Sequence, residues 1–531
     1  MFRFLKKQRL AARGMSCGKT RLATSERYLY ERLENGLLMR GVTVLAAAVL
    51  LLLFALNGNF SEPLKHLLYA LIILALAVIQ PFVQRESLLQ GNSRLALFLG
   101  LIFLQIGIGK FLQGQVLGGH LDARFLPLLI PYALAPLTLS VLLGSTVGFY
   151  ACLLGALWWA VFQEHVDQVF LLMVLSSGVV SVLATLRVRR RSRLLRAGLY
   201  SGVAVCVLGF LTSQIGPIVW LVPQLTDWSQ IFIESIVAIG TGIMTAVIVS
   251  GSLPLLERAF RISTEISLLE MADLNHPLLR RLSMEAPGTY HHSLAMANLA
   301  EACAEKVGAN STLCRVAAYY HDIGKLVKPE YFVENIPSGV NPHDDLTPTM
   351  SALIILSHVK DGVDLALRNK LNSRLIEAIQ QHHGTTLVEY FYQRACRQER
   401  DARAGGSLMK IRPEDIPKVS EESFRYPGPK PQSVETVILG LADAAESASR
   451  SLERPTLQRL DDLVHDLMQD RIADGQYDEA PVTMAQLQEI AATLVSCLGS
   501  MHHTRIGYKK GDAAKEREKE NPQSAVFSDR F

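Results

Sequence analysis

Long stretches without a charged side chain constrain the fold of this chain more than any other feature of its sequence. Residues 125–162 are 38 consecutive positions with no Asp, Glu, Lys or Arg. A helix needs about 20 apolar residues to cross the hydrocarbon core of a bilayer. This stretch is therefore long enough for two membrane-spanning helices, and we expect the turn between them near Gly144 and Ser145.

Similar stretches elsewhere predict a bundle of eight membrane spans. Hydrophobic residues make up 49% of the chain and charged residues only 19%, a balance typical of a membrane protein. Lys110 interrupts one stretch, so that seven spans is the alternative count. The predicted spans lie within residues 41–56, 67–83, 95–117, 125–162, 168–186, 197–226 and 235–256.

The distribution of lysine and arginine predicts the orientation of the bundle. Residues 1–40 contain ten basic and three acidic side chains, and six arginines lie within 187–196 after the sixth span. Both segments are expected in the cytoplasm, and eight crossings return the chain there near residue 257. Only Lys110 and Glu234 place charge in or near a span, which favours an anchor or sensor bundle in lipid over a transport pathway.

A change of composition near residue 257 marks a second, cytoplasmic part of the chain. Short amphipathic helical patterns separated by Pro, Gly and Asn turns predict an all-α domain there. The net charge of +4 does not indicate a nucleic-acid polymer as partner, and seven cysteines without a CxxC pair fit a reducing compartment. The predicted segments are a basic cytoplasmic segment at 1–40, the transmembrane bundle at 41–256, a connector helix at 257–284, the all-α domain at 285–508 and a disordered tail at 509–531.

Candidate metal ligands are concentrated in this second part. Eight of the fourteen histidines fall between His276 and His383. Each candidate taken singly has a structural explanation, such as a core histidine or a helix cap, but their order on consecutive helices favours one site. Five imidazoles and two carboxylates suit iron, manganese or zinc rather than calcium, and are enough for two ions that share one carboxylate. The candidates are His292, His321, Asp322, His358, His382, His383 and Asp443.

Five blocks that carry these residues resemble the HD superfamily of metal-dependent phosphohydrolases. The most similar branch is the membrane-anchored one, the seven-transmembrane HD receptors that act as cyclic di-AMP phosphodiesterases in bacteria. The blocks are LLEMADLNHPLLRRLSMEAPGTYHHS, HDIGKLVKPEYFVEN, NPHDDLTPTMSALIILSHVKDG, HHGTTLVEYFYQRA and FRYPGPKPQSVETVILGLADAAESASRSL. Many members carry a large extracellular domain after the first span, whereas only about ten residues, NGNFSEPLKH, separate the first two spans here.

The resemblance implies a two-ion site, with iron or manganese as the expected metals. One ion would be held by His292, His321, Asp322 and Asp443. The other would be held by His358, His382 and His383, with Asp322 bridging both; His276 and His291 lie outside the set. The implied location is the bacterial inner (cytoplasmic) membrane, with the HD domain in the cytoplasm, and whether homodimers form stays open.

The implied reaction is hydrolysis of cyclic di-AMP to linear pApA, because two ions can activate water and offset phosphate charge. Asp322 would be central to catalysis, and Lys325 would bring positive charge to the phosphate unless it is only a surface helix charge. Gly324 would leave room for the phosphate. His343 either contacts substrate or caps its turn. The alternatives are a cyclic di-GMP phosphodiesterase, disfavoured because no Gly-Tyr-Pro element follows the His-His pair, and a non-catalytic cyclic-dinucleotide receptor.

Overall fold

The computed structural model of the chain forms two compact units, Met1–Glu270 and Met271–Phe531. All regular structure in the described residues is helical, as the sequence predicts, apart from one isolated bridge between Leu387 and Arg425. The residues that the structure describes are 34, 36–57, 62–83, 91–163, 168–186, 188, 190–216, 227–260, 262–336, 341–409, 418–452 and 455–503.

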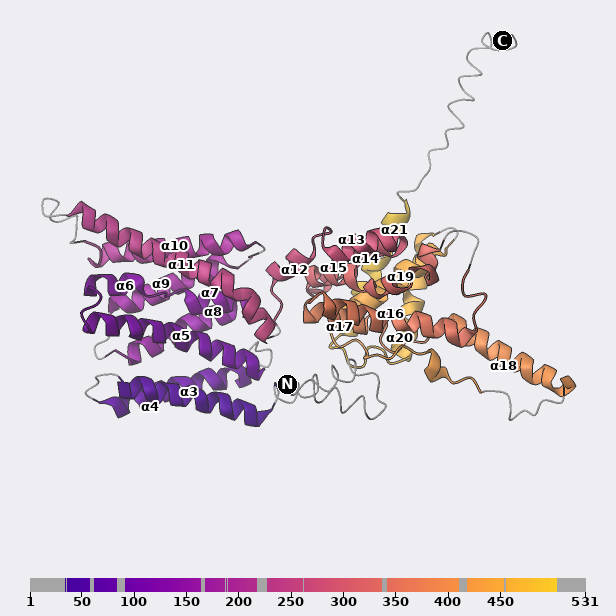
Figure 1. Cartoon of the computed structure of the whole chain (residues 1–531), viewed down its shortest axis with the longest axis horizontal. Helices are drawn as coiled ribbons and strands as arrows, with labels where there is room; N and C mark the ends of the chain where they lie inside the picture. Colours follow the sequence, from indigo (N-terminus) through magenta and orange to yellow (C-terminus); the bar gives the residue numbers. More distant parts are fainter. Residues whose placement is uncertain are drawn as a thin grey trace, which may run out of the picture. The chain divides into compact units, whose positions relative to one another are not determined.

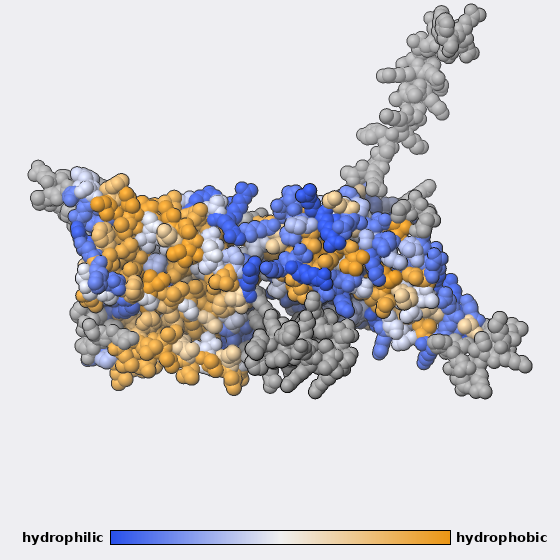
Figure 2. Space-filling model, viewed as in Figure 1, coloured by the Kyte–Doolittle hydropathy of each residue, from blue (hydrophilic) through white to orange (hydrophobic). Residues whose placement is uncertain are grey.

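The first unit is a bundle of apolar helices that run side by side (Figure 1). Hydrophobic residues cover most of the face of this bundle that Figure 2 shows, as expected for a surface in contact with lipid. The helices are α3 (Leu37–Asn57), α4 (Pro63–Val83), α5 (Asn92–Leu117), η1 (Ala123–Phe125), α6 (Leu126–Leu129), α7 (Leu134–Leu143), α8 (Ser145–Val161), α9 (Gln168–Ala184), α10 (Arg191–Leu211) and α11 (Trp228–Phe260).

Five helical segments in the described residues are long and apolar enough to cross a membrane. They are Leu37–Leu56, Asn92–Leu117, Ala123–Leu143, Arg191–Leu211 and Trp228–Phe260. Three shorter apolar helices, Pro63–Ile79, Ser145–Val161 and Gln168–Ala184, coincide with the other predicted spans. The turn expected after residue 143 is present, since Gly144 joins α7 to α8 with a φ of 100° that favours glycine. Residues 217–226 of the predicted span at 197–226 lie outside the described residues.

Lys110 does not interrupt α5, because the bundle satisfies its ammonium group. Lys110 Nζ donates to the carbonyl of Phe162 and to Gln113 Oε1 at 3.1 Å, and His66 Nδ1 donates to the carbonyl of Val161 at 2.6 Å. Both carbonyls lie at the C-terminal end of α8, where backbone acceptors lack helical partners and carry partial negative charge. Lys110 and His66 therefore cap α8, a structural role that agrees with an anchor or sensor bundle.

Glu234 is the other charged side chain singled out in the bundle, and it is also satisfied locally. It lies on α11 and is buried. Its carboxylate accepts from the backbone N–H of Gly216 at 3.2 Å and from Gln230 Nε2 at 2.8 Å. These two donors account for a buried carboxylate without a transport role.

The predicted single connector helix at 257–284 is wrong. These residues comprise the end of α11, then α12 (Glu265–Met271) and the first eight residues of α13 (Pro277–Glu285). Asp273 interrupts the helical pattern because its side chain accepts from Asn275 N at 2.9 Å, which closes a local turn. His276 then caps α13 by accepting from the N–H of Leu278 at 3.3 Å. The end of α13 at Glu285 lies at the predicted boundary between residues 284 and 285.

The second unit packs its helices around small buried side chains. Several alanines and Cys303 on α14, and alanines on α15, are buried, and such small residues let helix axes approach closely. The helices are α14 (Pro287–Val307), α15 (Ser311–Tyr320), η3 (Ile323–Val327), η4 (Pro329–Tyr331), η5 (Val333–Asn335), α16 (Pro348–Arg368), α17 (Ser373–Gln381), α18 (Glu389–Met409), η7 (Glu421–Phe424), α19 (Val434–Arg450), α20 (Leu457–Ala473) and α21 (Met484–His503).

Local sequence signals fix the ends of the helices that matter for the site. Pro287 opens α14, and Gly308 ends it in the left-handed region. Ser433 and Thr436 form a capping box at the start of α19. After the His-His pair, α18 continues as one helix to Met409. The predicted disordered tail at 509–531 and most of the basic segment at 1–40 lie outside the described residues.

Candidate metal centre

All seven predicted ligands converge within the second unit. They project from α14, from the ends of α15 and α17, and from α16 and α19. Six are buried and His383 is partly exposed. They form two groups, within each of which one ligand atom per residue lies within 4.8 Å of the others. The groups are His292, His321 and Asp443, and Asp322, His358, His382 and His383.

The carboxylate of Asp322 lies between these groups. Its Oδ2 is 3.1 Å from His321 Nε2 and 4.0 Å from His292 Nε2. Its Oδ1 is 3.4 Å from His358 Nε2 and 3.7 Å from His382 Nε2. The two oxygens of one side chain therefore face different groups, as a carboxylate that bridges two ions must.

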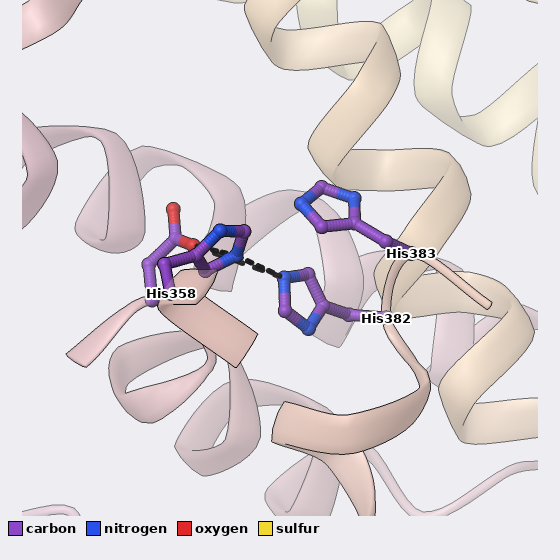
Figure 3. Close-up of side chains that lie close together, drawn as sticks. His358, His382 and His383 are labelled. Carbon is purple, nitrogen blue, oxygen red and sulfur yellow. Dashed lines mark hydrogen bonds and ion pairs between the residues drawn. The ribbon is translucent and has the colours of Figure 1, made fainter. Parts of the chain in front are cut away.

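Three of the histidines are oriented by their own helices. Each donates Nδ1–H to the backbone carbonyl three residues earlier, at 2.8 Å for His321, 2.6 Å for His358 and 2.9 Å for His382. An imidazole that donates from Nδ1 keeps its lone pair at Nε2, the state that a metal ligand needs. Figure 3 shows the rings of His358 and His382 turned toward each other, with their Nε2 atoms 3.4 Å apart.

His292 is oriented differently, by a carboxylate that the sequence analysis missed. Its Nδ1 donates to Glu446 Oε2 at 2.6 Å, while its Nε2 lies 3.0 Å from Asp443 Oδ1. Burial lowers the pKa of His292, but hydrogen bonds to Asp443 and Glu446 outweigh it and raise the pKa to about 10. A cation at this position would compete with the proton that His292 and Asp443 share. Glu446 follows Asp443 by three residues on α19, and this helical spacing was the available signal.

Buried polar atoms without hydrogen-bond partners show that the residues fit a metal centre, independently of their order along the chain. Within the described residues, His321 Nε2 and Asp322 Oδ1 are buried polar atoms without a hydrogen-bond partner. Leaving such atoms unsatisfied costs about 1–3 kcal/mol each, and more for a charged group. Both point into the centre, one toward each group of ligands. A pair of divalent cations would satisfy both atoms.

The electrostatics of the centre favour the protonation states that metal binding requires. Burial lowers the pKa of His358, His382 and His383, to about 3 for His382, where the neighbouring His321 adds to the effect. Burial alone would raise the pKa of Asp322 and Asp443, but nearby imidazoles, and for Asp322 also Lys325, hold both pKa values well below the ordinary range. The centre therefore favours neutral imidazoles at the His358 group and ionised carboxylates.

Lys325 lies beside the centre and is not a surface helix charge. Its side chain is 14% exposed, and its Nζ is 2.7 Å from Asp322 Oδ2 and 2.8 Å from Glu334 Oε1. It also lies over the ring of Phe332, 5.1 Å from the ring centre. Burial lowers the pKa of Lys325, but the two carboxylates outweigh it and hold the pKa well above its ordinary value. The position therefore keeps a permanent positive charge next to Asp322.

Gly324 has a packing role, which corrects the expectation that it leaves room for a phosphate. A Cβ added to Gly324 would lie 1.8 Å from the carbonyl oxygen of His358 and 2.5 Å from the N–H nitrogen of Gly362. The space beside Gly324 is thus filled by the backbone of α16. The missing side chain lets η3, which follows Asp322 directly, lie against the helix that carries His358.

Three histidines considered in the sequence analysis, His276, His291 and His343, are not members of either group of ligands. His343 Nε2 donates to the carbonyl of Tyr331 at 2.8 Å, and its ring packs between Tyr331 and Phe391. These contacts favour the interpretation that His343 holds its turn. His276 caps α13, and His291 is exposed on α14.

Tyr426 is a second residue near the ligands that the sequence analysis did not single out. Its ring stacks on His383 with centres 4.2 Å apart, and it meets the ring of His358 edge-on at 5.9 Å. Its backbone N–H donates to the carbonyl of Thr386 at 3.0 Å, which ties the segment before α19 to the turn after the His-His pair. Tyr426 therefore shields the most exposed ligand.

The helical fold and the centre define a class, the HD-domain proteins attached to a membrane helix bundle. Comparison with family models agrees on both parts: a 7TM receptor with intracellular HD hydrolase matches residues 64–264, and the HD domain matches residues 289–448. The chain belongs to this family of seven-transmembrane HD receptors. The first match begins inside α4, after α3.

Two curated relatives are similar over most of this chain. A protein of Listeria monocytogenes named cyclic-di-AMP phosphodiesterase PgpH is 38% identical over 72% of this chain and 50% of its own length. A Bacillus subtilis protein of the same name is 33% identical over 85% of this chain and 61% of its own length. The chain thus spans only half to three fifths of these relatives.

A solved structure of the HD domain of the Listeria protein also matches. It is 45% identical, covers 43% of this chain and 100% of the solved chain, and has a TM-score of 0.39.

Proposed function

We propose that this chain is a membrane-bound phosphodiesterase that hydrolyses cyclic di-AMP to linear pApA with two divalent ions, iron or manganese. The observation that carries the proposal is the position of Asp322, whose two carboxylate oxygens face two separate groups of ligands. The substrate rests on the two curated relatives, both named as cyclic-di-AMP phosphodiesterases.

The ligand residues would divide between two ions as the family resemblance implies. His292, His321 and Asp443 would hold one ion, His358, His382 and His383 the other, and Asp322 would belong to both. When bound, such ions lower the pKa of an attacking water and offset the negative charge of the phosphodiester.

The protein's own groups prepare this centre for the reaction. Backbone carbonyls orient His321, His358 and His382, and Glu446 orients His292, so that little reorganisation of these imidazoles is needed when charge develops. Lys325, held at Asp322 and Glu334, adds a positive charge beside the shared carboxylate and would attract a phosphate oxygen. His343 would act indirectly, by holding the backbone of Tyr331.

The proposed location is the bacterial inner membrane with the HD unit in the cytoplasm. The basic segments at 1–40 and 187–196 support this orientation, because short cytoplasmic segments are enriched in lysine and arginine. The description of the matching family as having an intracellular HD hydrolase agrees with it.

The test uses the full chain in detergent with added Mn²⁺ and separate cyclic di-AMP and cyclic di-GMP, with products identified by mass. We expect pApA from cyclic di-AMP and at least tenfold slower turnover of cyclic di-GMP. Asp322→Asn should abolish turnover, whereas Glu399→Gln, on α18 away from the centre, should not. Faster cyclic di-GMP hydrolysis would reject the assigned substrate, and binding of cyclic di-AMP without any hydrolysis would show a receptor.

A further inference from the structure

The two groups of ligands differ in which atom accepts the Nδ1–H hydrogen bond of their imidazoles. In the group of His358, His382 and His383, the first two donate Nδ1–H to neutral backbone carbonyls. His321 in the other group does the same. Only His292 donates to a carboxylate, that of Glu446 at 2.6 Å.

Glu446 is a buried carboxylate whose two oxygens have separate partners. Its Oε2 accepts from His292, and its Oε1 accepts from Arg450 Nε at 2.7 Å. The side chain of Glu446 is 4% exposed, whereas that of Arg450 is 44% exposed. A pair with Arg450 alone could form at the surface, where such pairs contribute little. The contact with His292 is therefore the one that requires a carboxylate inside the domain.

A carboxylate that accepts the Nδ1–H hydrogen bond of a ligating histidine makes that imidazole a stronger metal ligand. Partial transfer of the Nδ1 proton to the carboxylate raises the electron density at Nε2. The first position, next to Glu446, also has Asp443, whose Oδ1 lies 3.0 Å from His292 Nε2, in addition to its share of Asp322. The second position has the three imidazoles of His358, His382 and His383 and a share of Asp322, and only the more distant Oδ2 of Asp443 faces it, 3.6 Å from His383 Nδ1. The Coulomb attraction for a divalent cation is thus greater at the first position.

The second position is also more accessible to solvent than the first. His383, at the second position, is the only partly exposed member of the seven, with a side chain that is 19% exposed. At the first position, His292, His321 and Asp443 are all buried. An ion at the second position can exchange with solvent more readily.

We propose that Glu446 is a positioning residue that makes the ion position of His292, His321 and Asp443 the tighter of the two. The inference rests on the proposed two-ion centre. It assigns Glu446 no contact with substrate, and it predicts that the two ions load in order, first at the Glu446 side and then at the His383 side.

The experiment is calorimetric titration of the metal-stripped full chain in detergent with Mn²⁺ alone. For the unsubstituted chain we expect two binding events of different affinity. Glu446→Gln keeps the size and an acceptor oxygen but removes the charge, and should weaken the tighter event by about 10- to 100-fold while leaving the other unchanged. The melting temperature in chelator does not by itself judge the variant, because loss of the Glu446 hydrogen bond lowers stability in any case; a merely structural role would lower it without selecting one binding event.

Glu399→Gln is the matched control, because Glu399 also pairs with an arginine four residues later on its helix, and the control should change neither event. If Glu446→Gln does not fold, Glu446→Asp decides, since it keeps the charge but withdraws it from His292 by one methylene and should weaken the same event.

Unchanged affinities, or equal weakening of both events, would overturn the role of Glu446. Absence of any Mn²⁺ binding to the unsubstituted chain would instead reject the two-ion centre on which the inference rests.

Discussion

Substitution of Gly324 by alanine is the sharpest single test of how the centre is assembled. The added Cβ would lie 1.8 Å from the carbonyl oxygen of His358, and ordinary van der Waals contact begins at 3.4 Å. The difference, 3.4 minus 1.8, requires a separation of about 1.6 Å between η3 and α16 at this point. Neither side can yield by a side-chain rotation, because the obstacle is the backbone of α16.

A movement of this size would reach both ion positions. Gly324 follows Asp322 by two residues, and the obstructing carbonyl belongs to His358 itself. Metal–ligand distances tolerate only about 0.2 Å, so Asp322 and His358 could not serve one ion after the shift. Overpacking of this kind costs about 1–3 kcal/mol of folding free energy.

We therefore expect Gly324→Ala to lower Mn²⁺ stoichiometry from two ions per chain and to reduce turnover by at least 100-fold. Metal content by mass spectrometry, turnover and thermal unfolding in chelator would be measured together. Gly240→Ala is the control, since a Cβ at Gly240 on α11 meets nothing within 4 Å. Two ions and ordinary turnover in Gly324→Ala would refute the argument that this close approach positions Asp322.

Three further outcomes are expected. In chelator, thermal stability should be greatest near pH 6.5. His382, with a pKa lowered to about 3, destabilises the fold as the pH falls below 6.5, whereas His292, with a pKa raised to about 10, loses its stabilising proton as the pH rises toward that value. A melting temperature independent of pH, or the same loss of stability at acidic pH in His382→Gln, would contradict this. Tyr426→Ala should lower turnover by about tenfold and Tyr426→Phe should not, because stacking on His383 needs the ring alone; equal losses in both variants would point to the hydroxyl instead. Removal of divalent ions by chelation should abolish turnover, with recovery on addition of Mn²⁺ or Fe²⁺ but not Ca²⁺, whose preferred ligands are oxygens; recovery with Ca²⁺ would reject the imidazole-rich centre.

The sequence was sufficient to predict the helical architecture and the convergence of the seven ligand candidates. Uncharged stretches reveal membrane spans because a bilayer imposes a minimum apolar length, and the order of His and Asp blocks is specific enough to outweigh the ordinary explanation of each residue. The break in the expected connector was missed because it depends on one side-chain contact, from Asp273 to the backbone of Asn275.

Roles that depend on approach between distant segments were not accessible from the sequence. Gly324 was assigned to the phosphate, whereas its neighbour in space is the backbone of α16, which is 34 positions later at His358. Lys110 looked like an interruption of a span because its partner carbonyl, at Phe162, lies on another helix. Glu446 could have been found, since its spacing from Asp443 places both on one face of a helix.

The position of the Asp322 carboxylate between the two groups of ligands also limits how such a protein can change its metal preference. In the proposed two-ion centre, a substitution at Asp322 would alter both coordination spheres at once, so selection could not retune one ion through this residue while preserving the other. Divergence toward a mixed-metal enzyme must therefore begin at the histidines that belong to one sphere alone.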